Sequence, residues 1–449
     1  MFPGSRLVRA LLLALAGAAV LLAVRCGRGG GGPRTPAWPR SPDVLLVTID
    51  TLRADALGFA GNRRVETPTL DRLASQGLVF ANAHAHNVVT LPSHVNILTG
   101  LYPYQHGVRD NSGFRVDPKT PMLATWLKER GYATGAFVGA FPLDSRFGLA
   151  RGFDTYDDRY PKGRAALDFK MPERPAGEVI AAARKWYAEN TGQPRFLWVH
   201  LYDCHAPYRP PAPLDERYRD NPYLGEVAAV DAALKSLLDP FLAGQAPPTL
   251  IVLTADHGEA LGDHEELTHG LFAYEATLHV PLLLWMRGVI APGKSSAFAR
   301  HVDLAPTILA AAGVEKPANL PGSSLLKDRP ASVSTYFEAF STSYNRGWAP
   351  LRGVLAGGFK FIDLPRPELY DLASDPAETR NLIDAERDRA RRLRAELPAE
   401  SEFGATSRGA VSPEEVARLK SLGYLSGSGT RKQRYTAEDD PKNLVNVDR

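Results

Sequence analysis

The 449-residue sequence has very little cysteine and no large excess of charge of either sign. Its only cysteines are Cys26 and Cys204, so a disulfide framework cannot hold the fold together. The net charge is +3, and the densest basic stretch, residues 387–394, is interrupted by helix-forming residues. Such a stretch is typical of a solvated helix face and not of a nucleic-acid-binding surface. We therefore expect a globular protein with an ample core, without internal repeats and without a nucleic-acid partner.

The N-terminus carries a long apolar run. Arg6 and Arg9 precede an uncharged stretch from about residue 10 to 24, and a glycine- and proline-rich stretch follows at once. This order is typical of an export signal or a short membrane anchor that is followed by a flexible linker. Cys26 ends the run where a lipidation cysteine would stand. We expect an exported protein of the periplasm or cell envelope, attached to the membrane if this segment is uncleaved or lipidated.

The rest of the chain alternates between buried-strand and helix patterns. Apolar runs of strand length are separated by stretches of helical period, such as residues 121–130 and 176–190; the runs are residues 44–49, 196–201, 250–253 and 280–285. This alternation predicts an α/β fold with a large, mostly parallel sheet and helices on both faces.

The pattern changes after about residue 330. Short segments there predict a small antiparallel sheet and two further helices, at 384–397 and 413–422. The predicted organisation is a signal peptide or anchor (1–26), a flexible linker (27–41), a catalytic domain (42–330), a small C-terminal subdomain (331–425) and a disordered tail (426–449).

Polar side chains follow three of the predicted strands. Asp50 follows the first strand, Asp203 and His205 follow the second, and Asp256 and His257 follow the third. Because ligands bind at the carboxyl ends of parallel strands, these residues predict one shared site.

A metal cation explains why Asp50, Asp256 and His257 would converge. Carboxylates on neighbouring strand ends repel each other unless a cation lies between them, and oxygen ligands with one imidazole suit Ca²⁺, Mg²⁺, Mn²⁺ or Zn²⁺. The alternative is that Asp256 only bonds its own loop. A second cation would need further ligands, for which the sequence offers Asp203, Asp263 and His264.

Thr90 opens a short predicted helix that ends at Gly100, with Pro92 at the first helical position. A hydroxyl at the positive end of a helix is well placed to attack a bound phosphate or sulfate. Threonine is a poor nucleophile at neutral pH, so Thr90 needs a partner base or coordination to the cation. Alone, this residue would more often be a helix cap.

Further side chains are candidates for holding the anion or protonating the leaving group. These are Asn111, His205 and His269, because an imidazole near its own pKa is a natural general acid. His94 would contact the anion or hold the Thr90 turn. We expect purely structural roles for the remaining candidates, His84, His86, His279 and His301.

Several segments, in one consistent order, resemble the sulfatase family within the wider group of alkaline-phosphatase-like hydrolases. They are residues 47–55, 67–71, 91–100, 255–259, 269–275, 302–307 and 368–376. The resemblance implies an alkaline-phosphatase-like fold, a divalent cation, and ester hydrolysis through a covalent intermediate on Thr90. It implies Asp50, Thr90, Asp256 and His257 as metal ligands. Asn111, His205 and His269 would contact the transferred anion or the leaving group.

The chain also departs from the family pattern. Sulfatases carry a cysteine or serine at position 90 and oxidise it to formylglycine, whereas threonine cannot form that aldehyde. Thr51 stands in place of a second metal-binding aspartate, His94 in place of an arginine, and His269 in place of a lysine. Residues 138–141 lack an expected Lys-x-His pair. Each departure removes a positive charge or a metal ligand.

These features predict a metal-dependent hydrolase that cleaves a sulfate or phosphate ester in a small molecule, glycan or lipid. A phosphoester is favoured because water can attack phosphorus in a phosphothreonine with metal help. The alternatives are an envelope transferase of phosphoethanolamine type and a non-catalytic, sulfatase-like binding protein.

Overall fold

The computed structural model describes residues 38–159, 174–327, 333–399, 409, 412–421, 429–430 and 432–447. The chain divides into two compact units, Met1–Trp38 and Pro39–Arg449, and the second contains nearly all described residues. The predicted signal or anchor at 1–26, and the linker as far as residue 37, lie outside the described residues. Among the described helices, none combines the length and apolar character that a membrane crossing requires.

A mixed sheet of eight strands forms the centre of the second unit. Its strands are β1 (Asp43–Ile49), β2 (Leu78–His84), β3 (Ala133–Val138), β4 (Thr155–Asp157), β5 (Arg195–Leu201), β6 (Thr249–Ala255), β7 (Leu282–Trp285) and β8 (Gly293–Arg300). They lie in the order β4-β3-β5-β1-β6-β7-β2-β8. β1 pairs in parallel with β5 and β6, whereas β7 is antiparallel to β6 and β2. The predicted large, mostly parallel sheet is confirmed.

Burial explains which strands the sequence reveals. Every residue of β1, β5 and β6 is buried, because helices cover both faces of the sheet, and these strands therefore appear as continuous apolar runs. β8 is an edge strand that begins Gly-Lys-Ser-Ser and is largely exposed. It has no apolar run, and the sequence analysis did not predict it.

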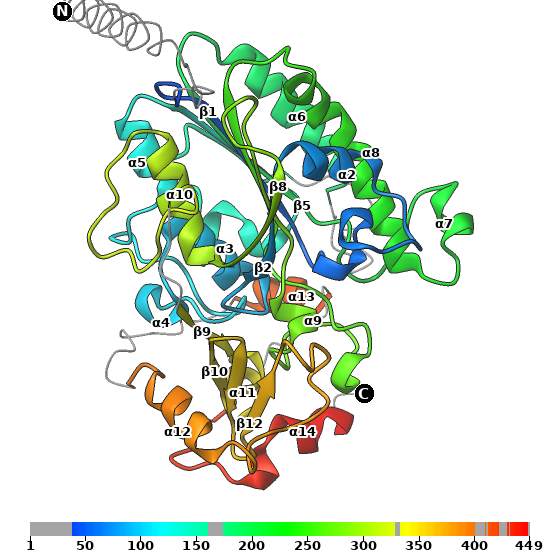
Figure 1. Cartoon of the computed structure of the whole chain (residues 1–449), viewed down its shortest axis with the longest axis vertical. Coiled ribbons are helices and arrows are strands. Elements are labelled where there is room, and N and C mark those ends of the chain that lie inside the picture. The colour runs from blue at the N-terminus through cyan, green and yellow to red at the C-terminus, as the bar shows by residue number, and fades with distance from the viewer. Residues whose placement is uncertain are drawn as a thin grey trace, which may run out of the picture. The chain divides into compact units, whose positions relative to one another are not determined.

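Helices flank the large sheet on both sides. Figure 1 shows α3, α5 and α10 on one side and α2, α6 and α8 on the other. The helices of this region are α2 (Pro68–Gln76), α3 (Thr90–Thr99), α4 (Pro103–His106), α5 (Leu123–Glu129), α6 (Ala176–Glu189), α7 (Leu214–Arg217), α8 (Pro222–Leu242), α9 (Glu275–Leu278) and α10 (Leu304–Ala311).

All ten residues of α3 are buried. The helix ends as predicted, since Gly100 adopts the left-handed backbone with φ of +71°. Its start differs from the prediction: Thr90 is the first helical residue and Val89 is the cap, so Pro92 stands in third place. Proline is tolerated there because the first-turn N–H groups have no partner within the helix.

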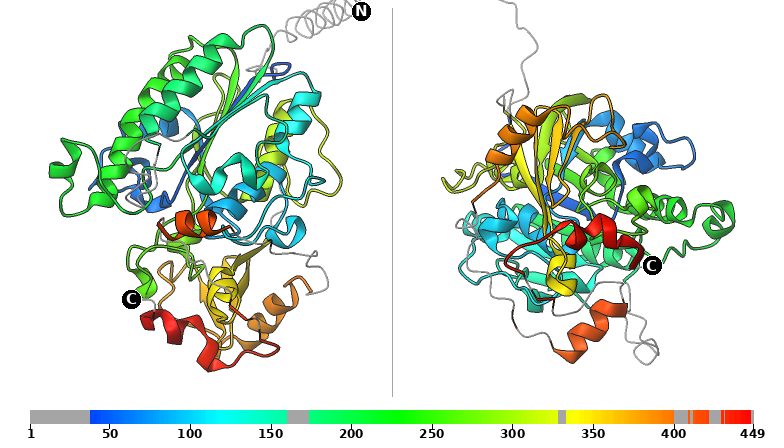
Figure 2. Two further views of the ribbon diagram at one scale, coloured as in Figure 1. Left: turned by 180° about the vertical axis from the view of Figure 1, so that it is seen from behind. Right: turned by 90° about the horizontal axis from the view of Figure 1, so that it is seen from below.

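A small antiparallel sheet follows, as predicted. Its strands are β9 (Ser334–Ala339), β10 (Leu351–Ala356), β11 (Phe359–Asp363) and β12 (Glu368–Asp371), in the order β12-β11-β10-β9, with α11 (Ser341–Arg346) between the first two. Helix α12 (Arg387–Ala395) packs on this sheet through Leu393, which lies in a buried cluster with Phe361 and Leu369. Figure 2 shows the small sheet from two further directions.

Buried ion pairs join the small sheet to the rest of the unit. Arg109 donates from Nε to Glu338 of β9 at 2.9 Å. The fully buried Lys360 of β11 lies 2.7 Å from Glu275 and 2.9 Å from Glu378. Because these partners come from distant parts of the chain, the two sheets pack as parts of one unit.

The C-terminal residues include one predicted helix and a segment for which no secondary structure was predicted. Helix α13 (Pro413–Ser421) is present, and residues 432–447, expected to be disordered, contain α14 (Pro441–Leu444) and short turns. Asp440 is fully buried and accepts a hydrogen bond from the Arg366 N–H at 2.8 Å. A polar composition therefore did not predict disorder correctly here, because specific hydrogen bonds tie the segment down.

Candidate active site

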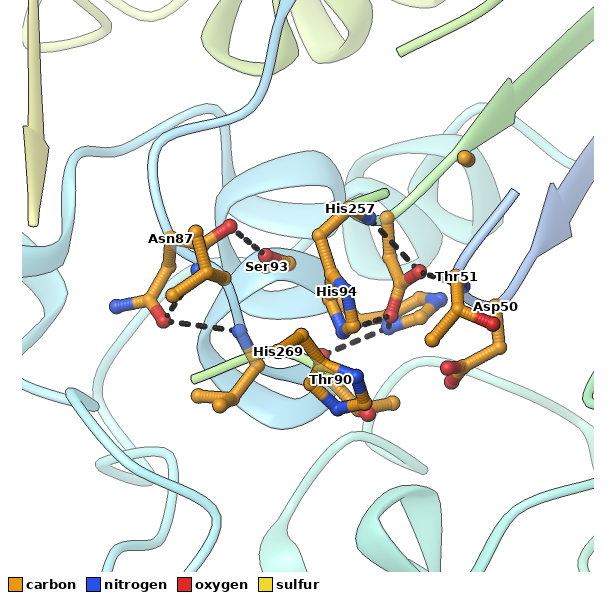
Figure 3. Close-up of polar contacts among 12 residues, drawn as sticks. Asp50, Thr51, Asn87, Thr90, Ser93, His94, His257 and His269 are labelled. Carbon is orange, nitrogen blue, oxygen red and sulfur yellow. Dashed lines mark hydrogen bonds and ion pairs between the residues drawn. The ribbon is translucent and has the colours of Figure 1, made fainter. Parts of the chain in front are cut away.

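Strand register brings the first two predicted ligands together. β1 and β6 are parallel neighbours with Ile49 opposite Ala255, so the next residues, Asp50 and Asp256, emerge side by side at the carboxyl edge of the sheet. Asp50, Asp256 and His257 are all fully buried. Asp50 and His257 lie beside α3 (Figure 3), and Asp256 Oδ2 is 3.6 Å from Nδ1 of His94 on that helix. The predicted convergence of these strand ends is therefore present in the structure.

The unsatisfied atoms of these three residues fit a divalent cation. Both carboxylate oxygens of Asp50, Oδ2 of Asp256 and Nε2 of His257 are buried without hydrogen-bond partners. His257 donates from Nδ1 to the Gly258 carbonyl at 2.9 Å, so the lone pair of its neutral ring is on Nε2. One ligand atom from each residue lies within 4.8 Å of the others. Two carboxylates and one imidazole form a donor set suited to such an ion.

Burial makes the carboxylates hard to ionise without a cation. It raises the pKa of Asp50 to about 7, although interactions with His269 and the Thr90 side chain limit the rise. Burial and the neighbouring Asp50 likewise raise the pKa of Asp256. These directions indicate that the protein alone leaves the negative charge at this edge under-compensated.

A chain of hydrogen bonds positions Thr90. Trp198 donates from Nε1 to Thr48 Oγ1 at 3.0 Å, and that hydroxyl lies 3.0 Å from His94 Nε2. His94 in turn donates from Nδ1 to the Thr90 carbonyl at 2.8 Å. Since burial lowers the pKa of His94, its ring is neutral, with its single proton on Nδ1. His94 therefore holds the Thr90 turn, one of the two roles that the sequence left open.

His94, His200 and Asp256 also lie close enough to suggest a cation site. The hydrogen bonds of His94 contradict this reading, because its Nδ1 carries a proton directed at a carbonyl and its Nε2 accepts from Thr48. Neither nitrogen has a lone pair left for a metal. Among the described residues, the candidate cation site is therefore the group of Asp50, Asp256 and His257.

Asn111 lies beside the start of α3. Its Oδ1 accepts the Leu91 N–H at 2.7 Å, which satisfies one of the unpaired donors of the first helical turn. Its Nδ2 is buried without a partner. Asn111 thus caps the helix with one atom and has its other side-chain atom available as a donor.

His269 carries the positive charge that the sequence comparison had suggested was lost with the lysine. It lies 3.0 Å from Glu259 through Nδ1, and Tyr208 donates to the other Glu259 oxygen at 2.9 Å. Although burial favours the neutral ring, Glu259 raises the pKa of His269 to about 9. The buried Glu259 thus favours a protonated His269, which would supply a positive charge in place of the lysine.

His205 completes a group of adjacent imidazoles. Its ring stacks on Tyr202 with a centroid distance of 4.5 Å and meets the ring of His269 at 5.1 Å. The ring of His269 lies 4.5 Å from that of His257. Burial lowers the pKa of His205, so this ring is neutral beside the charged His269. The predicted residues around Thr90 thus include one cationic and one neutral imidazole.

The residues considered for a second cation are engaged elsewhere. Asp203 accepts the Ala176 N–H with both oxygens at 3.0 Å, and Asp263 pairs with Arg53 at 2.9 Å. His264 lies 3.1 Å from the Ala377 carbonyl. The four histidines expected to be structural have partners outside the predicted site residues: His84 with Glu275, His86 with Tyr336, His279 with Ala81 and His301 with Ala255.

Sequence reasoning missed three residues of this region. Glu259 ends the family-like segment 255–259 and Tyr208 lies three residues after His205, but the pairing of Glu259 with Tyr208 depends on the fold. His200 is fully buried on β5 with Nε2 at 3.3 Å from Asp50 Oδ2. Its position inside an apolar run gave no sequence signal.

A model of the sulfatase family matches residues 42–314, more than half of the chain. The chain belongs to the sulfatase family. A second model, the C-terminal region of N-sulphoglucosamine sulphohydrolase, matches residues 263–401. The expectation drawn from the motifs is confirmed at the level of the family.

Relatives within the sulfatase family span most of the chain. The uncharacterized sulfatase YidJ of Escherichia coli is 25% identical over 77% of this chain and 84% of its own length. N-acetylglucosamine-6-O-sulfatase of Bacteroides thetaiotaomicron is 24% identical over 77% of this chain and 83% of its own length.

Solved structures show the same fold. BT4656, in complex with its substrate D-glucosamine-2-N,6-O-disulfate, has a TM-score of 0.68 at 21% identity and covers 82% of this chain and 99% of its own. Phosphonate monoester hydrolase of Agrobacterium radiobacter has a TM-score of 0.65 at 20% identity, with 79% and 94% covered. The family fold thus includes both sulfate and phosphonate ester hydrolases.

Proposed function

We propose that this sulfatase-family chain is a metal-dependent hydrolase that cleaves a phosphate or sulfate ester through a covalent intermediate on Thr90. The observation that carries the proposal is the position of Thr90 at the start of buried α3, next to Asp50 and its unpartnered carboxylate oxygens. A hydroxyl, a cation-binding set and anion donors therefore meet at one edge of the sheet.

Asp50, Asp256 and His257 would hold the cation together with Thr90. A bound divalent cation would lower the pKa of the Thr90 hydroxyl and neutralise charge that develops on the ester oxygens. Ca²⁺, Mg²⁺, Mn²⁺ and Zn²⁺ all suit these donors.

The remaining residues would act on the substrate. The Thr90 hydroxyl gives its proton to solvent, Oγ1 attacks the central atom of the ester, and the bond from that atom to the leaving oxygen breaks. The protonated His269 donates its proton to that oxygen, while Asn111 Nδ2 donates a hydrogen bond to the anion. Water then attacks the same central atom, the bond to Thr90 Oγ1 breaks, and Oγ1 takes back a proton from solvent. The neutral His205 would accept the proton of the attacking water and pass it to His269, whose ring lies 5.1 Å away, so that both imidazoles return to their starting states.

A phosphoester is the favoured substrate because of the threonine itself. A sulfate ester on a hydrated aldehyde can collapse by elimination from its second hydroxyl, whereas a threonine ester has no such exit. Phosphorus in a phosphothreonine is open to in-line attack by water. The chemistry of Thr90 therefore separates this chain from a formylglycine enzyme.

Substrate size and location are parts of the same proposal. Relatives with names that specify sulfated sugars support a glycan ester, and small-molecule or lipid esters also fit the chemistry. The apolar N-terminal run supports export to the periplasm or cell envelope, with membrane attachment if it is retained. We also propose the division of the chain at about residue 330 into a catalytic domain and a small subdomain.

A parallel assay tests the reaction. Metal-stripped protein, reconstituted with each cation in turn, is given an aryl sulfate, a phosphate monoester and a phosphodiester. We expect phosphoester turnover, a mass increase of one phosphoryl group on the peptide with Thr90 after acid quench, and loss of turnover by about a thousandfold or more in Thr90→Ala. Full activity in Thr90→Ala would exclude Thr90 as nucleophile, and turnover of the sulfate alone would reverse the substrate preference.

A further inference from the structure

His200 is a buried polar residue that the proposed reaction does not use. It lies on β5, in register with Thr48 of β1 and Val138 of β3, and its exposed fraction is zero. Neither ring nitrogen has a hydrogen-bond partner. Because an unpaired buried donor or acceptor costs about 1–3 kcal/mol, a leucine or methionine here would give a more stable strand.

The surroundings of His200 fix where its ring can lie. The ring meets that of His94 edge-on, with a centroid distance of 4.8 Å and an interplanar angle of 80°. His94 is itself held at both nitrogens. In this position Nε2 of His200 is 3.3 Å from Asp50 Oδ2. The ring thus has one polar neighbour within reach, and that neighbour is a proposed metal ligand.

Asp256 shows how this site holds a carboxylate. Its Oδ1 accepts the backbone N–H of His257 at 2.8 Å and that of Thr51 at 3.2 Å, while its Oδ2 is left without a partner. Thr51 has a left-handed backbone with φ of +54°, uncommon for a β-branched residue, which places its N–H against Asp256 (Figure 3). One oxygen is therefore anchored and the other is open.

Asp50 has no corresponding backbone donors. Both of its oxygens lack a hydrogen bond, although it is the other carboxylate of the same site. An unanchored carboxylate would lose rotational freedom when it binds a cation, and that loss would weaken binding. The Thr90 side chain interacts with Asp50, but in the proposed reaction that hydroxyl is the nucleophile; the group placed to anchor Asp50 throughout is the imidazole that approaches its Oδ2.

We propose that His200 is the positioning residue for Asp50: its Nε2 lies 3.3 Å from Oδ2 and would donate to that oxygen when Oδ1 binds the cation. This inference rests on the proposed metal-dependent function. His200 does not contact the substrate or act as a ligand; it orients a ligand. Partners of this kind contribute about tenfold to a hundredfold to metal affinity in other sites.

Two measurements on three variants test this role. The metal-free protein is melted by calorimetry, and Mn²⁺ and Ca²⁺ are each titrated into it by isothermal calorimetry. His200→Leu removes the polar ring, and His200→Gln keeps an N–H donor. His106→Leu is the matched control, because His106 is also buried but has partners outside the proposed site: its Nδ1 accepts the Val108 N–H and its Nε2 lies 2.9 Å from the Asn96 side-chain amide.

A positioning residue and a structural residue give opposite results. We expect His200→Leu to melt a few degrees above the wild type without metal and to bind the metal at least about tenfold more weakly. His200→Gln should bind within about threefold of the wild type. His106→Leu should melt lower and bind the metal normally.

Other results would overturn the inference, each in a distinct way. Unchanged metal affinity in His200→Leu would show that Asp50 needs no anchor. Lower melting of His200→Leu would assign His200 to the core. Two ions per wild-type chain and one in His200→Leu would make His200 a ligand. If the wild type bound neither ion, the proposed metal dependence would be wrong as well. That failure is seen in the wild type itself, whereas failure of the His200 inference alone is seen only by comparing the variants with a wild type that binds metal.

Discussion

Thr48 shows how one hydroxyl can organise a nucleophile that it does not touch. It accepts from Trp198 and donates to His94, and His94 then fixes the Thr90 carbonyl. Each donor and acceptor along this line is buried, so each depends on the next for its hydrogen bond. Thr48 of β1 and Trp198 of β5 therefore fix the Thr90 backbone through His94.

Thr48→Val should damage both stability and turnover. It keeps the shape of the side chain but leaves Trp198 Nε1 and His94 Nε2 unpaired, which we expect to lower the free energy of unfolding by about 1–3 kcal/mol. A shifted Thr90 should lower kcat by about tenfold or more. Urea unfolding and steady-state kinetics measure the two effects.

Thr99→Val is the matched control for that change. Thr99 is equally buried and lies in the same helix, but its hydroxyl donates to the Val95 carbonyl, away from Thr90. We expect its kcat to stay within about twofold of the wild type. An equal loss of kcat in both variants would show that the helix as a whole, and not the relay, sets the rate.

At the scale of elements, α3 depends on a residue outside the helix. Asn111 caps its first turn through Oδ1 and keeps Nδ2 free of partners. Capping and anion binding therefore use different atoms of one amide. This separation allows stability and substrate binding to be changed independently.

Asn111→Asp and Asn111→Ala should separate the two roles. The aspartate keeps the capping oxygen, so its melting temperature should stay near that of the wild type, while kcat/KM falls by about tenfold or more for loss of a donor and repulsion of the anion. The alanine should also lose about 0.5–2 kcal/mol of stability. Normal kcat/KM in the aspartate variant would remove Asn111 from the anion site.

The loop between β6 and α9 contains a buried carboxyl group, that of Glu266, whose ionisation lowers the stability of the folded protein. Glu266 accepts the Leu271 N–H at 2.7 Å and the Phe272 N–H at 3.3 Å, yet burial raises its pKa to about 8 from 4.5. The folded protein therefore holds this proton more tightly than the unfolded chain. Its stabilising contribution is complete below about pH 4.5 and declines as the pH rises toward about 8.

Glu266→Gln should flatten this part of the pH dependence. Between about pH 5 and 8, the stability of the wild type should fall relative to that of the glutamine variant by at least about 1 kcal/mol. Unfolding in urea across this range measures the difference. Glu129→Gln, on an exposed helix end, should leave the wild-type slope unchanged. A constant difference between Glu266→Gln and wild type would contradict the shifted pKa.

At the scale of the whole molecule, charges hold the two sheets together. Lys360 of β11 is fully buried between Glu275, at the start of α9, and Glu378. Neither carboxylate lies on the same sheet as the lysine. The small sheet thus contributes a cation to a cluster that the other segments complete.

Lys360→Met should destabilise the protein by about 3–5 kcal/mol, because it leaves two buried carboxylates without their cation. Chemical unfolding measures this loss. Lys235→Met is the control, since Lys235 pairs with Asp239 on the exposed face of α8. This change should lower the free energy of unfolding by less than about 1 kcal/mol. Similar small losses in both variants would show that the sheets are held by apolar packing.

The sequence by itself determined the class of fold and predicted that Asp50, Asp256 and His257 lie together. The apolar runs of β1, β5 and β6 are continuous because both faces of these strands are buried, and Asp50, Asp256 and His257 follow them directly. Local patterns of this kind can be recognised in a single sequence without the structure. Three features were predicted less well. The helix of Thr90 begins at a different residue, and edge strand β8 is exposed and therefore has no apolar run. Residues 432–447 have a polar composition but are held by hydrogen bonds such as that of Asp440.

Only the tertiary structure decided the charge and orientation of the site. Glu259 and His269 are ten residues apart in sequence, but a carboxylate makes an imidazole cationic only when the two are buried within hydrogen-bonding distance. His200 and Asp50 are far apart in the sequence and meet through the parallel pairing of β1 with β5. Electrostatic and hydrogen-bond energies depend on distance and solvent exposure, and a sequence contains neither until it folds.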